Sequence, residues 1–250
     1  MQLPIEMICC RCGEKFIEYC EQVLVNDPEM LEISKQYAYC PMCKTKMKEE
    51  AEAEKQKQKE ARKAAELEEN YQARWKKSGL DRYHLDYDRD NRNANPELFR
   101  FVEYHRNSCL WIAGKTALCK TRILQHFGRL ALKDRSVQYW PTMDLLCALS
   151  ENAKNISRWM NSIYAVDLLI LDDLGAETVT EARMKFLFNI IDRRMTGYEQ
   201  YRRGMIGRTL GWQLWVSTND NGSALYRNMG AYAEPCIRRL QENCDIWEKF

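Results

Sequence analysis

Two pairs of cysteines near the N-terminus have the spacing of a metal site. Cys9 and Cys12 form one C-x-x-C turn, and Cys40 and Cys43 form a second one. Each turn directs two thiolates toward one point, so two turns supply the four ligands of tetrahedral Zn²⁺. The metal would stabilise a segment too small for a core of its own. We predict one Zn²⁺ on these four residues. Cys10 in place of Cys9, or reduced cysteines without metal, are the alternatives.

The second chemical signal is a loop that could bind phosphate. It has the spacing G-x-x-x-x-G-K-T, with Cys119 in place of the second glycine, and consists of Gly114, Lys115, Thr116, Ala117, Leu118, Cys119, Lys120 and Thr121. In such a loop, backbone N–H groups surround the phosphates of ATP. Lys120 would reach the β- and γ-phosphates, and the Thr121 hydroxyl would hold Mg²⁺. Cysteine is small, so we expect Cys119 to reduce the fit rather than to abolish binding.

Polar side chains also follow two apolar runs further along the chain. The run 168–171 is followed by Asp172 and Asp173, and the run 213–217 is followed by Asn219 after one residue. At the end of a buried parallel strand, Asp172 would hold Mg²⁺ and Asp173 would orient or deprotonate the attacking water. Asn219 would hold that water near the γ-phosphate. The alternative is an ordinary strand with acidic turn residues.

Arginines suggest two further roles. Arg238 and Arg239 lie at the start of an expected helix, where an arginine could act across a subunit boundary. The segment 196–211 combines arginines, tyrosines and glycines, which suits a mobile loop that binds single-stranded DNA through Arg202, Arg203 and Arg208. A solvated surface loop is the alternative, and 154–159 is a second candidate with the same chemistry.

The elements that position these residues alternate between strands and helices. We expect strands at 109–113, 137–140, 168–171 and 213–217, and helices at 121–132, 143–150 and 181–195. This order predicts an α/β fold with a parallel sheet covered on both faces. We therefore expect three segments along the chain: a zinc ribbon at 1–43, a charged helical linker at 44–78 and the α/β domain at 79–250. The linker's sparse apolar residues favour a solvated spacer helix over a coiled coil.

Composition limits the remaining possibilities. The chain has 250 residues, of which 45% are hydrophobic and 30% charged, with a net charge of +2. No apolar run is long enough for a membrane span and no signal peptide is visible, so we expect no membrane association. The number of cysteines is odd, eleven, and four of them form metal-type pairs, which indicates the reducing cytoplasm.

The ordered motifs GKTALCKT, LLILDDLG, WVSTND and RRLQENCDIWEKF resemble the AAA+ ATPases of the DnaC/IstB family, which are helicase loaders and transposition helpers. The resemblance covers about 80–250. It implies ATP and Mg²⁺ as ligands, a domain without a C-terminal helical lid, and assembly into a homo-oligomer. It assigns the sensor role to Asn219 and the trans-acting arginine to Arg239. Ala117 and Cys119 stand where the family usually has glycine.

The same resemblance implies a replicative helicase or a transposase-like protein as partner, together with single-stranded DNA. Zinc modules occur among loaders, where they dock on the helicase. We therefore expect an ATP-driven loader that acts on a DNA-bound partner. A nucleotide-sensing adaptor that hydrolyses little ATP is the alternative. A non-catalytic DNA-binding module is a third possibility, and nucleotide binding would exclude it.

Overall fold

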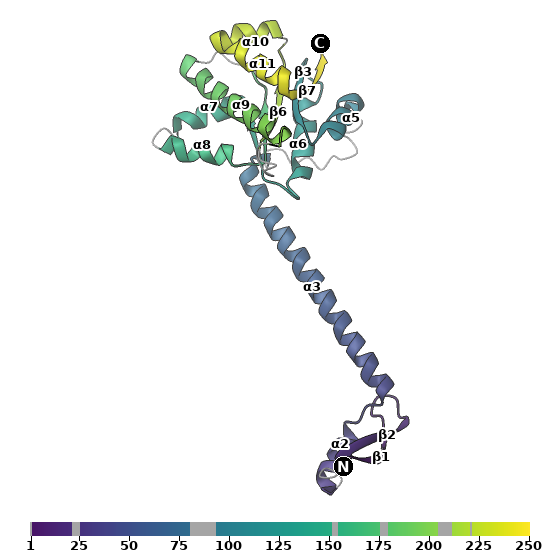
Figure 1. Ribbon diagram of the computed structural model, residues 1–250. Helices are drawn as coiled ribbons and strands as arrows, with labels where there is room; N and C mark the ends of the chain where they lie inside the picture. Colours follow the sequence, from purple (N-terminus) through teal and green to yellow (C-terminus); the bar gives the residue numbers. More distant parts are fainter. Residues whose placement is uncertain are drawn as a thin grey trace. The chain divides into compact units, whose positions relative to one another are not determined.

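The computed structural model describes residues 2–21, 26–80, 94–151, 155–175, 180–204, 212–220 and 222–250. The chain divides into two compact units, Met1–Leu67 and Glu68–Phe250. Figure 1 shows their elements along the chain.

The N-terminal unit begins with an antiparallel hairpin of β1 (Gln2–Ile8) and β2 (Lys15–Glu21). Helix α2 (Pro28–Gln36) follows. Its first turn is capped by Asp27, whose side chain accepts hydrogen bonds from the next two free backbone N–H groups. Helix α3 (Pro41–Ser78) then begins within the second cysteine pair. The helix therefore starts a few residues before the predicted linker at 44–78, and it ends at the same residue.

The end of α3, from Glu68 onward, belongs to the second unit. Tyr71 and Trp75 contact its hydrophobic core, and the guanidinium of Arg129 lies 5.0 Å from the centroid of the Trp75 ring. Gly79 follows the helix with a φ of +72°, and a Cβ there would lie 2.6 Å from the Tyr139 carbonyl oxygen. The last turns of α3 are thus packed against the core of the second unit, and only the part of the helix before them can be a solvated spacer.

The second unit is built on one parallel sheet of five strands in the order β4-β5-β6-β3-β7. The predicted α/β class is confirmed. Four strands lie within one residue of their predicted bounds: β3 (Cys109–Gly114), β4 (Val137–Pro141), β5 (Leu168–Asp172) and β6 (Gln213–Thr218). Because all five run in the same direction, their carboxyl ends meet at one edge of the sheet.

Alternate residues of the strands face two separate apolar layers. On β3, Leu110 and Ile112 belong to the layer that includes helices α5 (Pro96–His105) and α6 (Lys120–Ala131). Cys109, Trp111 and Ala113 belong to the opposite layer. That layer includes α7 (Thr142–Glu151), α8 (Ile156–Tyr164), α9 (Glu181–Arg202), α10 (Gly222–Met229) and α11 (Ala233–Asn243). Burial on both faces explains why these strands are continuously apolar in sequence.

Strand β7 (Cys244–Lys249) was not predicted from the sequence. It pairs in parallel with β3, from Cys109 opposite Cys244 to Gly114 opposite Lys249. The strand lies at the edge of the sheet, and most of its residues are half-buried or exposed. It therefore lacks the apolar run that reveals the central strands. Helices α5, α8 and α10 were also outside the predicted set.

The predicted loop at 196–211 is wrong for its first half. Helix α9 continues to Arg202, and Gly197 lies inside the helix against Trp212. A Cβ at Gly197 would lie 2.5 Å from the Trp212 ring, so close packing rather than a turn requires this glycine. Residues 205–211 lie outside the described part of the chain.

Within the described residues, no helix combines the length and the apolar character that crossing a membrane requires.

Candidate nucleotide-binding site

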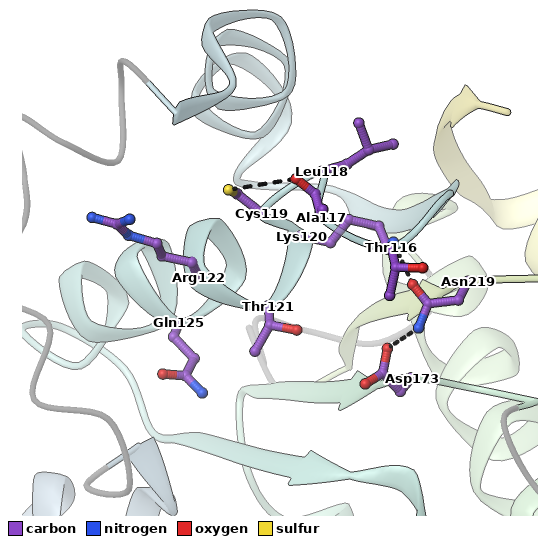
Figure 2. A pocket seen from close by; sticks show the side chains of 10 residues that line it. All are labelled: Thr116, Ala117, Leu118, Cys119, Lys120, Thr121, Arg122, Gln125, Asp173 and Asn219. Carbon is purple, nitrogen blue, oxygen red and sulfur yellow. Dashed lines mark hydrogen bonds between the residues drawn. The ribbon is translucent and has the colours of Figure 1, made fainter.

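The predicted phosphate loop connects β3 to α6 at the carboxyl edge of the sheet. A pocket of about 350 Å³ lies over it, within the range of small-molecule sites. The lining residues, shown in Figure 2, are Thr116, Ala117, Leu118, Cys119, Lys120, Thr121, Arg122, Gln125, Asp173 and Asn219. The fold therefore brings together the loop, Asp173 and Asn219, which follow the ends of β3, β5 and β6.

Lys120 is the first residue of α6, and only 5% of its surface is exposed. Its ammonium donates to the carbonyl oxygens of Gly114 at 2.6 Å and Lys115 at 2.8 Å, and to Asn219 Oδ1 at 2.7 Å. Burial lowers the pKa of Lys120, while the charges of two nearby carboxylates oppose that shift. These acceptors use all three donors of the ammonium, so a bound phosphate would replace one of them and meet a buried positive charge.

The loop backbone requires two left-handed residues. Ala117 has a φ of +67° and Cys119 a φ of +58°, although neither is glycine. This conformation costs an L-residue roughly 1–2 kcal/mol, because Cβ approaches the carbonyl oxygen. The sequence prediction treated Cys119 as the main defect. The structure shows that Ala117 is under the same restraint, so the missing glycines matter through backbone conformation as well as bulk.

The first glycine of the loop has a packing role. A Cβ on Gly114 would lie 2.6 Å from the Lys249 carbonyl oxygen. The same oxygen accepts a hydrogen bond of 3.2 Å from the Lys115 N–H. The start of the loop is therefore held against the end of β7, and only glycine permits this approach.

Asp172 ends β5 and is 2% exposed. One of its carboxylate oxygens accepts a hydrogen bond of 2.7 Å from the Tyr139 hydroxyl, and the other accepts one from the Ser217 hydroxyl. Thr142 donates to the Asp172 backbone carbonyl at 2.8 Å. These contacts fix the carboxylate, and each oxygen keeps a second lone pair for a cation.

Asp173 follows in the left-handed conformation, with a φ of +57°. Its N–H donates to Ser217 Oγ at 3.1 Å, and Asn219 Nδ2 donates to its carboxylate at 2.7 Å. Burial raises the pKa of Asp173, and the neighbouring charge of Asp172 raises it further, while Lys120 and Asn219 act in the opposite direction. A strained backbone at a polar site is typical of functional residues.

Arg239 differs from the sequence expectation in two ways. It lies in the second half of α11 rather than at a helix start. It also has an acidic partner, because its Nε donates to Asp192 of α9 at 2.8 Å. Arg238 is more exposed and lies 3.8 Å from Glu242. Neither arginine lines the nucleotide pocket of its own chain.

Two of the three arginines proposed for DNA, Arg202 and Arg203, lie at the end of α9. Arg202 stacks 5.9 Å from the ring centroid of Tyr198, and Arg203 pairs with Glu199. Tyr198 is 7% exposed, so its ring offers little surface to a base. Arg208 lies outside the described residues.

The second DNA candidate, 154–159, forms the beginning of α8 in its described part. Its Trp159 packs edge-on against Trp140, with the ring centroids 6.2 Å apart. Arg158 is exposed on this helix, whereas Lys154 lies outside the described residues.

The four predicted zinc ligands gather in the N-terminal unit. The sulfur atoms of Cys9, Cys12, Cys40 and Cys43 all lie within 4.8 Å of one another. The Sγ atoms of Cys12 and Cys40 are 3.7 Å apart, close to the roughly 3.8 Å edge of a tetrahedron with Zn–S bonds of about 2.3 Å. Cys10 lies outside this group, so the cluster contains Cys9. The four thiols fit a zinc ion.

Several residues around the nucleotide site were not predicted. Tyr139 and Ser217 hold Asp172, Asp192 holds Arg239, and Asn95 donates to the loop at Leu118. Each is distant in sequence from its partner, and of these residues only Ser217 lies within one of the motifs. The order of the strands and the packing of the helices bring them to these positions.

Comparison with known families decides the relationship of this chain. Residues 32–217 match the family described as IstB-like ATP binding protein, which is well over half of the chain. The chain belongs to this family. The predicted family is thus confirmed, and the domain around the pocket is an IstB-like ATP-binding domain. No curated protein matches the chain.

Solved structures similar to this IstB-like chain include the DnaC helicase loader, at 18% identity and a TM-score of 0.47, covering 70% of this chain and 98% of that one. DnaA from Aquifex aeolicus bound to AMPPCP is 20% identical, with a TM-score of 0.47 and coverage of 69% and 50%. DnaI is 18% identical, with a TM-score of 0.46 and coverage of 66% and 87%.

Proposed function

We propose that this chain is an ATP-hydrolysing replication factor of the helicase-loader type, which acts on a DNA-bound protein partner. One observation carries the proposal: Lys120, Asp173 and Asn219, which follow three different strands, line one pocket, and the buried Asp172 precedes Asp173 at the end of β5. These are the groups that phosphoryl transfer to water requires: a cation for the phosphates, an oxygen site for Mg²⁺ and a base for the nucleophile.

In this proposal the loop N–H groups and Lys120 bind the phosphates. Thr121 and Asp172 would hold Mg²⁺, which neutralises phosphate charge when bound. Asp173 accepts a proton from the attacking water while the water oxygen forms its bond to the γ-phosphorus. The bond from that phosphorus to the β,γ-bridging oxygen breaks, and ADP leaves with the electron pair. Asn219 orients the water and keeps Asp173 in place.

We infer that hydrolysis needs an assembly of several copies. Arg239 does not line its own pocket, so a contact with the γ-phosphate would have to be made in the pocket of a neighbouring copy. A trans-acting arginine of this kind stabilises the negative charge that develops in the transition state. Its bond to Asp192 would have to be exchanged for that contact.

The partner proposal is a replicative helicase or a transposase-like protein, together with single-stranded DNA. The four-thiol cluster supports a zinc module in the N-terminal unit, which we propose as the docking module for the protein partner. We also propose a location in the reducing cytoplasm, because four of the eleven cysteines form metal-type pairs.

A nucleotide-sensing adaptor with little hydrolysis is the second candidate. The favouring observation is the loop, where Ala117 and Cys119 hold left-handed conformations that glycine adopts without strain. Strain in the loop lowers the fraction of molecules whose loop has the conformation that binds nucleotide, and this slows turnover.

Phosphate release by the purified full chain, with and without single-stranded DNA, separates the two candidates. The loader proposal predicts turnover that needs Mg²⁺ and disappears in Asp173→Asn, which keeps ATP binding. ATP binding without turnover under any of these conditions would favour the adaptor, and absence of binding would overturn both. A pull-down from host extract with ATP or a slowly hydrolysed analogue then identifies the partner.

A further inference from the structure

Asn95 uses both ends of its side-chain amide. Its Oδ1 accepts a hydrogen bond of 3.1 Å from the Leu98 N–H, which caps the first turn of α5. Its Nδ2 donates at 3.0 Å to the carbonyl oxygen of Leu118, which is 23 residues away in the phosphate loop. The residue is 8% exposed. A buried amide with both groups satisfied fixes the position of what it binds.

Leu118 lies between the two strained residues of the loop. Ala117 before it and Cys119 after it both have positive φ values. The hydrogen bond from Asn95 therefore reaches the carbonyl of Leu118, which lies between two residues in the unfavourable left-handed conformation. Holding this carbonyl fixes the orientation of the adjoining peptide planes, and the N–H groups of those planes are the ones that would face phosphate.

The same helix turn also holds the other end of the loop. Glu97 accepts a hydrogen bond of 2.7 Å from the Lys249 ammonium, and this contact lowers the pKa of Glu97. The Lys249 backbone oxygen in turn accepts from the Lys115 N–H at 3.2 Å. The first turn of α5 thus contacts Leu118 directly and Lys115 through the last residue of β7.

We propose that Asn95 is a positioning residue that stabilises the left-handed phosphate loop and so compensates for the glycines missing at 117 and 119. The expected effect of Asn95 on ATP affinity rests on the proposed ATP binding. Its effect on the loop itself can be measured without nucleotide.

The test is Asn95→Ser in the full chain. Serine is a good helix cap but is too short to reach Leu118, so the variant keeps α5 and loses the contact with the loop. Asn155→Ser is the matched control, since Asn155 precedes α8 and its side chain makes no capping bond. Hydrogen exchange of the amides of residues 115–121 and the Kd for ATP are measured in both variants and in the parent chain.

We expect faster exchange in these amides and an ATP affinity at least about fivefold weaker in Asn95→Ser, because the Leu118 carbonyl loses a buried donor. Asn155→Ser should match the parent. Unchanged exchange and affinity in Asn95→Ser would overturn the inference. If the loop exchanges faster but even the parent chain does not bind ATP, the positioning role stands and the proposed function fails.

Cys119→Gly tests the compensation separately. Glycine adopts positive φ without strain, so adding Asn95→Ser to Cys119→Gly should weaken ATP binding less than adding it to the parent. An equal loss in the two backgrounds would show that Asn95 does not compensate for Cys119. In the parent background, Cys119→Gly alone should tighten ATP binding.

Discussion

Asn219 accepts a hydrogen bond of 2.7 Å from the Lys120 ammonium, although the two residues are 99 positions apart. Its amide nitrogen donates at the same time to Asp173 at 2.7 Å. One side chain therefore joins the cation of the phosphate loop to the proposed base. A phosphate bound by Lys120 would lie next to the group that activates the water, which links binding to hydrolysis.

This link predicts a shift in the pH profile of hydrolysis. A base acts when deprotonated, and burial raises the pKa of Asp173, so the rate should fall on acidification at a pH above the usual aspartate range. Asn219→Ala removes a donor that lowers this pKa, so the acid limb should move to higher pH. Rate–pH profiles of the parent, Asn219→Ala and the exposed control Asn161→Ala provide the measurement. An acid limb at the same pH in Asn219→Ala and the parent would show that Asn219 does not influence the pKa of Asp173.

The cysteine cluster predicts one zinc ion per chain. Cys40→Ser combined with Cys43→Ser removes two of the four thiolates, and metal analysis of the full chain should then show almost no zinc. Cys10→Ser combined with Cys20→Ser is the matched control, because neither residue belongs to the cluster, and it should keep the metal. Zinc that is absent from the gently purified parent, or retained in the first variant, would refute the site.

The proposed trans-acting arginine predicts complementation between two inactive variants. Arg239→Ala should lower the hydrolysis rate about 10³-fold, and Lys120→Ala should lack ATP binding. Mixing the two should restore part of the activity, since each copy supplies what the other lacks. Arg238→Ala, whose exposed side chain lies next to Glu242, should retain most of its activity. A failure to restore activity at any ratio, with both variants folded and assembling, would argue against action between copies.

Arg202 and Arg203 predict a contact with single-stranded DNA at the end of α9. Replacing both by alanine should weaken binding and reduce the salt dependence of log K by about 1–2 units, while ATP binding stays intact. The matched comparison is Arg158→Ala in the second candidate segment. If the double variant binds DNA as the parent does and Arg158→Ala does not, the contact lies on α8.

The parts of the fold that could be predicted from sequence are those with local signals. Buried parallel strands are continuously apolar, so β3, β4, β5 and β6 could be identified, and polar residues at their ends indicated the site. The cysteine pairs could also be identified from sequence, because local turn geometry sets the spacing of the metal ligands. Strand β7 is different: it is a partly exposed edge strand, and its partner β3 lies more than a hundred residues earlier.

The contacts that complete the site could not be predicted in this way. Tyr139 reaches Asp172 only because β4 and β5 are neighbours, and Asp192 reaches Arg239 only because α9 packs on α11. Glycine usually interrupts helices, so the sequence predicts a loop at Gly197, whereas in the structure this glycine lies within α9 and packs against the Trp212 ring. Such contacts depend on sheet order and helix packing, which a local pattern does not specify.

The most direct test of the account is ATP binding by Lys120→Ala, measured by calorimetric titration in the presence of Mg²⁺. Lys133→Ala is the matched control, because this lysine side chain is exposed beyond the end of α6 and does not line the pocket. We expect the parent and Lys133→Ala to bind ATP with similar Kd values. Lys120→Ala should show no ATP binding in this titration, because it loses the buried charge that would neutralise the phosphates. A folded Lys120→Ala that binds ATP as tightly as the parent would contradict the assignment of the site.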